Sequence, residues 1–142
     1  MKILIVCVGN ICRSPMAEAV LRRRLPDGFA ISSAGLAARI GDGVHPVAAE
    51  VLREQGYAAY EHQARQFERV MIDDAELVLT MEQRHSRALM ALAPTLRGRL
   101  HLLGRWDGQR EIRDPCGRPK ASFEEAFEQI ERAAQLWCAR IA

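Results

Sequence analysis

The sequence predicts an α/β fold, a three-layer sandwich with a central four-stranded parallel sheet and helices on both faces. Four short apolar segments have the composition of buried strands, and segments with helical periodicity separate them along the chain. Strands that alternate with helices usually pair in parallel, because a helical crossover returns the chain to the same end of the sheet. The chain of 142 residues has the size of one domain, so we expect residues 1–142 to form a single domain.

The first strand and helix are predicted at the start of the chain. Residues 2–8 are apolar and rich in β-branched side chains without polar alternation, as in a central strand that is buried on both faces. Ser14 and Pro15 then resemble the N-cap and first turn of a helix, in which Glu18 completes a capping pattern. The segment CVGNICRSP, residues 7–15, is therefore predicted to be a strand–loop–helix junction.

The remaining elements alternate in the same way. We expect further strands at residues 29–35, 75–81 and 99–104, and helices at residues 46–55, 82–94 and 122–142. Gly56 and Pro94 are predicted to end two of these helices, and Ser122 is predicted to cap the last one. The last helix has one apolar stripe, formed by Phe123, Phe127, Ile130, Ala134 and Trp137.

Composition and charge argue against several classes of protein. The 20 basic and 18 acidic residues are scattered along the chain and leave a net charge of +2, which does not favour nucleic-acid binding. The apolar stretch at the N-terminus is too short for a signal peptide or a membrane span. Four cysteines in a chain with its own apolar core are not a disulfide scaffold, so we expect unpaired thiols in a cytoplasmic protein.

The junction after the first strand has the features of an anion-binding loop. Ligands of open parallel sheets bind beyond the carboxyl ends of the strands, and free N–H groups at a helix start attract a phosphate-sized anion. Gly9 leaves room for a tight curl, Asn10 tolerates left-handed backbone, and Arg13 can bind two oxygens of a tetrahedral oxyanion. The predicted phosphate-binding loop consists of Val8, Gly9, Asn10, Ile11, Cys12, Arg13 and Ser14.

Cys7 lies at the base of this loop and is the candidate nucleophile. The loop amides, the helix N-terminus and the Arg13 guanidinium would all stabilise a thiolate, and Ser14 can donate a hydrogen bond to it. The alternative is that Cys7 is a small core residue and Arg13 a solvated charge. The sequence lacks the glycine and lysine spacing of nucleotide phosphate loops, which argues against a nucleotide cofactor.

Cleavage of a phosphate ester also requires an acid that protonates the leaving oxygen. Asp114 follows the fourth predicted strand, at the edge of the sheet where ligands bind. Aspartates before proline also serve as turn residues, so the residues alone leave both roles open. Glu82 can reach the same edge from the end of the third strand. The other acids are explained as turn, cap or surface residues: Asp42, Asp73, Asp74 and Asp107.

These segments together resemble the low-molecular-weight protein tyrosine phosphatases, in particular the bacterial members associated with capsule and exopolysaccharide export. The resemblance covers essentially the whole chain through VCVGNICRSPMAE, ISSAG, HQARQ, LVLTMEQRH, LLGRW and IRDP, in the order and spacing of that family. It implies a protein-tyrosine phosphatase in which Cys7 becomes phosphocysteine and Arg13 binds the phosphoryl oxygens. By the same resemblance, Asp114 is the acid of the first step and the base that activates water in the second.

The resemblance also implies supporting residues and partners. Asn10, Ser14, Ser33 and His62 would brace the loop by hydrogen bonds. The other histidines share no metal-ligand spacing, and neither a metal nor an organic cofactor is expected. Inorganic phosphate and other oxyanions such as vanadate or arsenate should compete at the loop. The implied substrate is the tyrosine-rich tail of a bacterial tyrosine kinase of polysaccharide export, although no residue of the chain identifies that kinase.

Two features concern the other cysteines. Cys12 matches a second cysteine of the family, and the resemblance implies a redox role, in which a Cys7–Cys12 disulfide would protect Cys7 from irreversible oxidation. The alternative is that Cys12 only packs beneath the loop. Cys116 and Gly117 stand where the family usually has an aromatic residue after Asp-Pro. We therefore expect a mainly aliphatic mouth formed by Val8, Ile11, Leu36 and Arg39.

Two other functions fit part of the pattern. Arsenate reductases use a similar anion loop on the same scaffold, but they need a resolving pair of cysteines near the third strand, and residues 70–100 contain no cysteine. Cys116 is the one candidate resolver near the acid. A non-catalytic phosphate-binding module would keep the loop but would lack the thiol and the acid together, and this chain has both Cys7 and Asp114.

Overall fold

The computed structural model describes residues 1–58 and 61–142, and these contain the expected four-stranded parallel sheet. The strands are β1 (Lys2–Cys7), β2 (Ala30–Gly35), β3 (Leu77–Thr80) and β4 (Leu100–Leu102), in the order β2-β1-β3-β4. The helices are α1 (Arg13–Arg24), α2 (Pro46–Glu54), α3 (Gln83–Leu92) and α4 (Lys120–Ile141). Short 3-10 helices are also present, η1 (Arg69–Ile72) and η2 (Pro94–Leu96). The predicted α/β fold is confirmed.

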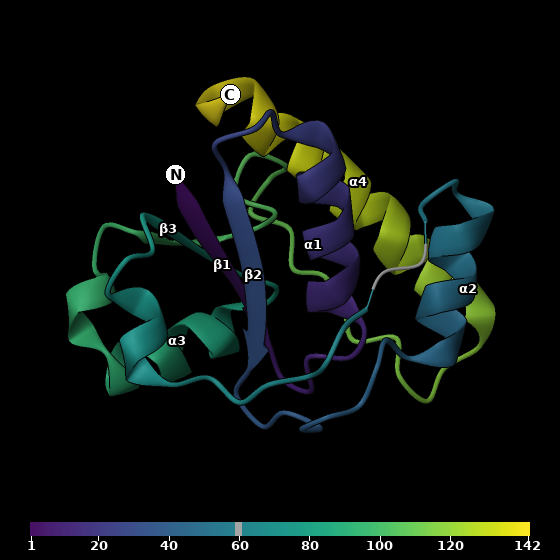
Figure 1. Cartoon of the computed structure of the whole chain (residues 1–142), viewed down its shortest axis with the longest axis horizontal. Helices are drawn as coiled ribbons and strands as arrows, with labels where there is room; N and C mark the ends of the chain where they lie inside the picture. The colour runs from purple at the N-terminus through teal and green to yellow at the C-terminus, as the bar shows by residue number, and fades with distance from the viewer. Residues whose placement is uncertain (59–60) are drawn as a thin grey trace.

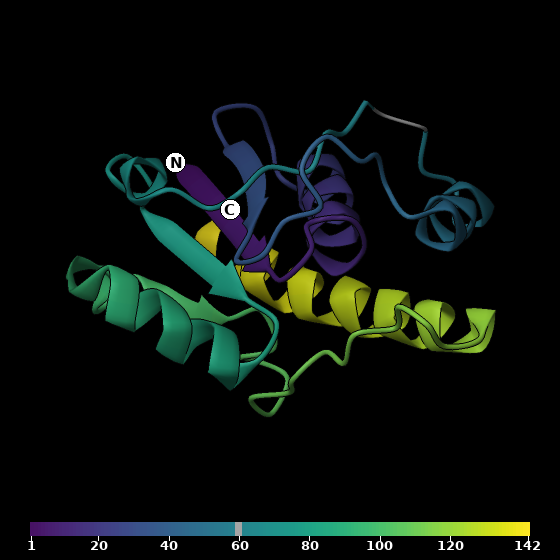
Figure 2. The ribbon, with the colours of Figure 1, turned by 90° about the horizontal axis from the view of Figure 1, so that it is seen from below.

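Alternate residues of β1 point into two different cores. Ile3 and Ile5 pack into one apolar cluster with residues of α1, α2 and α4, whereas Leu4 and Val6 pack into another with residues of η1, α3 and η2. Accordingly, α1, α2 and α4 lie on one side of the strands and α3 on the other (Figure 1). The view from below shows the same separation of α3 from α1 and α2 by the strands (Figure 2). Burial on both faces explains why this strand is apolar without alternation.

The long C-terminal helix covers the first of these cores. Its predicted apolar stripe is buried, from Phe123 through Phe127, Ile130 and Ala134 to Trp137. The indole Nε1 of Trp137 donates a hydrogen bond to the carbonyl of Leu103 at 2.8 Å. The helix is therefore held both by apolar packing and by a buried polar contact to the chain that follows β4.

The predicted cap of the first helix is wrong. Helix α1 begins at Arg13, and Ser14 lies inside its first turn instead of at the N-cap. The Ser14 hydroxyl bonds to the buried side chains of Cys7 at the end of β1 and of Asn10 in the following loop, so it does not cap the helix. Glu18, expected to complete the capping pattern, accepts a hydrogen bond from the Ser33 hydroxyl at 2.7 Å. The side chains of Ser14 and Glu18 therefore form hydrogen bonds with residues elsewhere in the fold, and neither one caps the helix.

The predicted cap of the last helix is also wrong. Helix α4 begins at Lys120, two residues before Ser122, and its N-cap position is Pro119. The ammonium group of Lys120 bonds to Glu50 at 2.8 Å and to Glu54 at 2.7 Å, both on α2. These contacts tie the first turn of α4 to a neighbouring helix, and so they favour a helix that starts before the serine.

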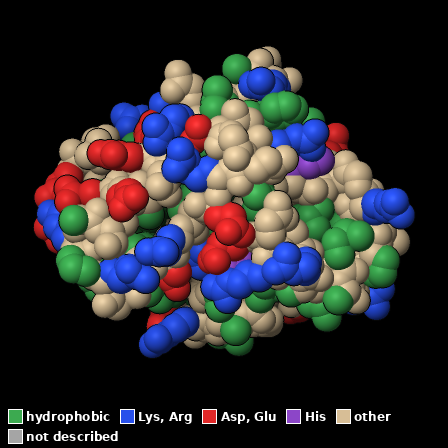
Figure 3. All heavy atoms as spheres, turned by 180° about the vertical axis from the view of Figure 1, so that it is seen from behind, with side chains coloured by type: hydrophobic (Ala, Val, Ile, Leu, Met, Phe, Trp, Pro, Cys, Tyr) green, Lys and Arg blue, Asp and Glu red, His purple; other side chains and the backbone are tan. Residues whose placement is uncertain are grey.

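Charges of both signs are spread over the surface. On the face shown in Figure 3, Lys and Arg side chains lie among Asp and Glu side chains, in keeping with the net charge of +2. In the part of the chain that the structure describes, every helix is too short or too polar to cross a membrane.

Candidate active site

Residues 8–13, which we call the anion loop, curl around a point at the carboxyl edge of the sheet. The carbonyl groups of residues 7–9 accept hydrogen bonds at 2.9 to 3.0 Å from backbone N–H groups of residues 36–39. The carbonyl of Ile11 accepts one at 2.7 Å from the N–H of His45. Among the described residues, the N–H groups of the anion loop donate to no other group. The loop carbonyls are thus used by neighbouring N–H groups, while the loop N–H groups have the arrangement that an anion-binding loop requires.

Asn10 braces the loop from within. Its φ of 58° is the left-handed conformation expected for this position, and its side chain is fully buried. The amide nitrogen donates to the hydroxyls of Ser14 at 2.8 Å and Ser33 at 3.0 Å, while the amide oxygen accepts from the N–H of Arg65 at 3.0 Å. The ring Nε2 of His62 lies 2.6 Å from the Asn10 carbonyl and donates to it, because a carbonyl can only accept.

The sulfur of Cys7 lies next to this network of hydrogen bonds. Cys7 is the last residue of β1, and its Sγ lies 2.9 Å from the hydroxyl of Ser14. Because the Ser14 oxygen already accepts a hydrogen bond from the Asn10 amide, its own O–H can donate to the sulfur. The four residues predicted to brace the loop, Asn10, Ser14, Ser33 and His62, are thus in one connected group.

A glycine at the end of β2 allows the anion loop to pack this closely. A Cβ atom at Gly35 would lie 2.4 Å from the carbonyl oxygen of Val8, far inside van der Waals contact. Gly35 also pairs with Cys7 at the last position of the β1–β2 register. Any side chain at this position would push the loop away from the strand that carries the thiol.

Arg13 is the largest of the fully buried side chains, with 2% of its surface exposed. Its Nη1 donates to Glu82 Oε2 at 2.5 Å and to the carbonyl of Ile112 at 2.8 Å. Its Nη2 lies 3.9 Å from Asp114 Oδ2. A buried guanidinium needs such partners, because desolvation of an unpaired charge is costly. The side chain is held by two partners while its other nitrogen is directed toward Asp114.

Glu82 is held in turn by several groups. Arg84 donates to both of its carboxylate oxygens, at 3.1 and 3.2 Å, and the buried His85 accepts a hydrogen bond from its N–H at 3.2 Å. Partial burial opposes ionisation, but the hydrogen bonds from Arg84 and Arg13 outweigh it and lower the pKa of Glu82 to about 2. Burial and the charge of Arg13 lower the pKa of His85 to about 4. The sequence indicated that Glu82 can reach this edge, but not that it holds Arg13.

Asp114 lies on the loop between β4 and α4, at the same edge as the thiol. Its side chain is 45% exposed, and its Oδ1 accepts a hydrogen bond from the N–H of Cys116 at 3.0 Å. The N–H of Ile112 donates to the carbonyl of Met81 at 2.9 Å, which joins this loop to the end of β3. Of the other acids, the exposed Asp42 pairs with Arg39, and the half-buried Asp107 pairs with Arg110 and Arg132.

The segment that wraps the anion loop also carries apolar side chains. Ile11 and Leu36 are half-buried, in agreement with an aliphatic mouth, and Arg39 is exposed. Ile40, which the sequence analysis did not single out, is 73% exposed in the same segment. A large exposed apolar residue is informative only once its surroundings are known, so the sequence alone gave no signal for it.

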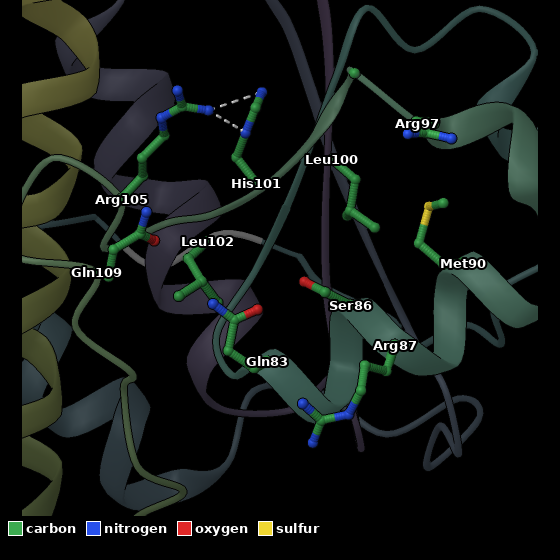
Figure 4. Close-up of a pocket in the computed structure, with 11 residues that line it drawn as sticks. Gln83, Ser86, Arg87, Met90, Arg97, Leu100, His101, Leu102, Arg105 and Gln109 are labelled. Atoms are coloured by element: carbon green, nitrogen blue, oxygen red, sulfur yellow. Dashed lines mark hydrogen bonds between the residues drawn. The ribbon is translucent and has the colours of Figure 1, made fainter.

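A separate cavity lies on the α3 side of the sheet. It has a volume of about 490 Å³ and runs between α3 and β4, with Arg87, Arg97 and Arg105 around it (Figure 4). Arg105 points to His101, and Leu100 and Leu102 line the wall on the β4 side. None of its lining residues is a cysteine, an aspartate or a glutamate, so this basic cavity lacks the groups of a thiol-based reaction centre.

Comparison with known proteins gives consistent matches over nearly the whole chain. The family model "Low molecular weight phosphotyrosine protein phosphatase" matches residues 2–142. The low molecular weight protein-tyrosine-phosphatase Wzb of Salmonella typhimurium is 44% identical over 136 residues, which are 96% of this chain and 91% of that protein.

Solved structures give the same picture. The structure of Vibrio vulnificus Wzb in complex with benzylphosphonate matches with a TM-score of 0.94 at 40% identity, over 99% of this chain and 98% of that chain. The YwlE arginine phosphatase from Geobacillus stearothermophilus matches with a TM-score of 0.92 at 32% identity, over 99% and 92% of the two chains.

Proposed function

Because the chain belongs to the low molecular weight phosphotyrosine protein phosphatase family and is a phosphatase, we propose that it hydrolyses phosphotyrosine in proteins through a phosphocysteine on Cys7. The observation that best supports this mechanism is the Cys7 sulfur beneath the unused N–H groups of the anion loop, 2.9 Å from the Ser14 hydroxyl. Residues 1–142 would form one phosphatase domain, since the family model spans almost all of them.

In the proposed first step, the Cys7 thiolate attacks phosphorus as the bond between phosphorus and the phenolic oxygen breaks. Asp114 gives its proton to the leaving oxygen, so that tyrosine departs neutral. The anion-loop N–H groups and Arg13 hold the remaining phosphoryl oxygens as charge develops on them. The 3.9 Å separation of Arg13 and Asp114 supports this division of roles, because it brings both side chains to the same phosphoryl group.

In the proposed second step, water attacks the phosphorus of phosphocysteine. The Asp114 carboxylate takes a proton from the water, Cys7 leaves as a thiolate, and inorganic phosphate is released. The same residue thus returns to its protonated state at the end of the cycle. The hydrogen bond from the Ser14 hydroxyl would stabilise the departing thiolate, and Asn10, Ser33 and His62 would hold the loop in its anion-binding shape.

The proposed preference for phosphotyrosine rests on the depth of the Cys7 sulfur below the surface and on the aliphatic side chains around the entrance to the site. Cys7 is only 3% exposed, and a phenyl stem reaches a recessed sulfur better than the short stem of phosphoserine. Ile11 and Leu36 offer aliphatic contact to the ring. The benzylphosphonate complex of the Vibrio vulnificus relative supports binding of a tetrahedral oxyanion next to a ring. Inorganic phosphate and vanadate should therefore compete with substrate.

The proposed protein substrate is a bacterial tyrosine kinase of polysaccharide export, dephosphorylated in the cytoplasm. Support comes from similarity to Wzb proteins and not from a residue of this chain. The arsenate reductase alternative is not favoured, because the matches are phosphatases and residues 70–100 carry no cysteine.

A rapid acid quench tests the mechanism. With a phosphotyrosine peptide, mass spectrometry should find a phosphate on the tryptic peptide that contains Cys7, with Cys138→Ser as the control that retains it and Cys7→Ser as the variant that loses turnover. Phosphoserine and phosphoarginine peptides test the substrate, since a relative is an arginine phosphatase. Faster hydrolysis of either of these, or turnover by Cys7→Ser near that of the wild type, would contradict the proposal.

A further inference from the structure

The basic cavity on the α3 side of the sheet has no role in the proposed reaction. Its volume of about 490 Å³ is in the range of sites that bind small organic molecules. It is bordered by α3, by the residues that follow η2, by β4 and by the connection after β4 (Figure 4). Cys7, Arg13 and Asp114 do not line it, so an occupant would leave the proposed catalytic site open.

The positive charge at this cavity has no acidic counterpart in its lining. Arg87, Arg97 and Arg105 come from three different segments and lie at separate positions around it (Figure 4). Among the described residues, Arg87 and Arg97 form no ion pair. Arg84 of the same helix, which does not line the cavity, pairs with Glu82 at 3.1 Å. A cavity lined by one sign of charge focuses the field and attracts counter-ions, which are anions here.

Arg105 is held in place at one side of the cavity. Its Nη1 donates a hydrogen bond to His101 Nδ1 at 2.5 Å, and its guanidinium carbon lies 4.7 Å from the ring centre of Trp106. Because His101 Nδ1 accepts this bond, the imidazole is neutral, and burial and the charge of Arg105 lower its pKa. A side chain that is already positioned loses less conformational entropy when it binds an anion.

The wall between the arginines is mainly apolar. Leu100 and Leu102 of β4 form one side of it, and Met90 of α3 forms the other (Figure 4). The amides of Gln83 and Gln109 also line the cavity and can both donate and accept hydrogen bonds. An inorganic anion would leave this apolar wall in contact with water, whereas an organic anion would cover it.

We propose that the basic cavity binds a small organic anion that carries several acidic groups, such as a phosphate chain, on an apolar or aromatic body. Because the guanidinium groups of Arg87, Arg97 and Arg105 lie at separate positions, a chain of acidic groups contacts more of them than a single phosphate does. The body of the ligand packs against Leu100 and Met90. Nucleoside polyphosphates have this chemistry. This binding does not rest on the proposed phosphatase reaction, because it uses none of the same residues.

Calorimetric titration tests the site with ATP and with inorganic tripolyphosphate as probes, without divalent cations, and with and without saturating vanadate. We expect one ATP per chain, with the same affinity whether or not vanadate fills the anion loop. ATP should bind about fivefold or more tightly than tripolyphosphate, because only ATP has an apolar body. Binding should weaken as the salt concentration rises. Competition between ATP and vanadate, equal affinity for the two probes, or no binding at millimolar ATP would each overturn the inference.

Two variants locate the bound probe. Arg87 and Arg97 are exposed and unpaired within the described chain, so Arg87→Gln and Arg97→Gln should both fold, and each should weaken ATP binding by about fivefold or more. Arg69→Gln is the matched control, since Arg69 is also exposed, lies outside the cavity and carries the same charge. It should bind ATP within about twofold of wild type. An equal loss in all three variants would show that only the overall charge matters and would overturn the site.

The indole N–H resonance of Trp106 gives a local readout of the same binding. The Trp106 ring stacks on Arg105, so ATP bound at this arginine should shift the resonance in a spectrum of vanadate-saturated protein. The shift should require higher ATP concentrations in the Arg87→Gln and Arg97→Gln variants but not in Arg69→Gln. A Trp106 resonance that stays unchanged when calorimetry shows saturation would place ATP elsewhere and refute the proposal.

Discussion

Replacing Glu82 with glutamine would leave the buried guanidinium of Arg13 without the nearer of its two charged partners. The ionised carboxylate bonds to Arg13 Nη1 at 2.5 Å, and only 19% of the Glu82 side chain is exposed. The amide of glutamine has similar size and can still accept one hydrogen bond, so the change removes mainly the charge. We expect Arg13 to lose its fixed orientation and to bind the phosphoryl group less well.

The size of this effect follows from the ionisation of Glu82. A pKa of about 2, against an ordinary value of 4.5, corresponds to about 3 kcal/mol in favour of the carboxylate. Arg84 and Arg13 share this stabilisation, so the part due to Arg13 is about 1 to 2 kcal/mol, in the range of charge-assisted hydrogen bonds. At about 1.4 kcal/mol per factor of ten, kcat/KM should fall roughly five- to thirtyfold.

The assay is steady-state hydrolysis of p-nitrophenyl phosphate together with inhibition by vanadate, and both should weaken. Because the pKa of Glu82 is depressed, its stabilisation is complete above pH 4.5 and is lost as the pH falls toward 2. The defect should therefore be constant between about pH 5 and pH 8. Arg84→Gln is the control, since it keeps the charge of Glu82 and should change kcat/KM less than threefold, about the worth of an exposed ion pair. Glu82→Gln with kcat/KM and vanadate inhibition within twofold of wild type would refute the reasoning.

Three further changes test separate parts of the site. Asp114→Asn should lower kcat/KM for phosphotyrosine by about 10²- to 10⁴-fold and for p-nitrophenyl phosphate much less, because a good leaving group needs no acid, and equal losses in both assays would exclude the acid role. Ser14→Ala removes the hydroxyl 2.9 Å from the Cys7 sulfur, so alkylation of Cys7 by iodoacetate at neutral pH should slow, and an unchanged rate would show that the hydroxyl does not stabilise the thiolate. Gly35→Ala would put a Cβ 2.4 Å from the Val8 carbonyl, so thermal unfolding should show a lower Tm, with a loss of about 1 to 3 kcal/mol from backbone strain, and an unchanged Tm would mean that the loop moves away freely.

The sequence predicted the elements well because their signals are local and repeated. The apolar run of β1 and the stripe of α4 record burial directly, and both are found as expected. Ser14 and Ser122 show where this reasoning stops. Their local patterns are those of helix caps, but the buried partners of one and the contacts of Lys120 near the other decide where the helices begin.

The candidate site could be predicted in part because its residues follow the ends of strands that the sequence also predicts. Cys7, Arg13 and Asp114 are found at one edge of the sheet, where parallel topology brings the ends of β1, β3 and β4 together. The contacts of Arg13 with Glu82 and with the carbonyl of Ile112 join residues far apart in sequence. A single sequence carries no periodic signal for such contacts, because they depend on how loops meet after folding.

The proposed nucleophile and the proposed acid belong to parts of the molecule that differ in regular structure. Cys7 is the final residue of a central strand that is paired on both sides, so the sheet fixes its position. Asp114 lies on an irregular connection in which Pro115 is buried but residues 116–119 are half-buried or exposed. Redesign of this enzyme for other leaving groups should therefore begin with replacement of the loop between β4 and α4. Strand β1, which carries the sulfur, can be kept unchanged.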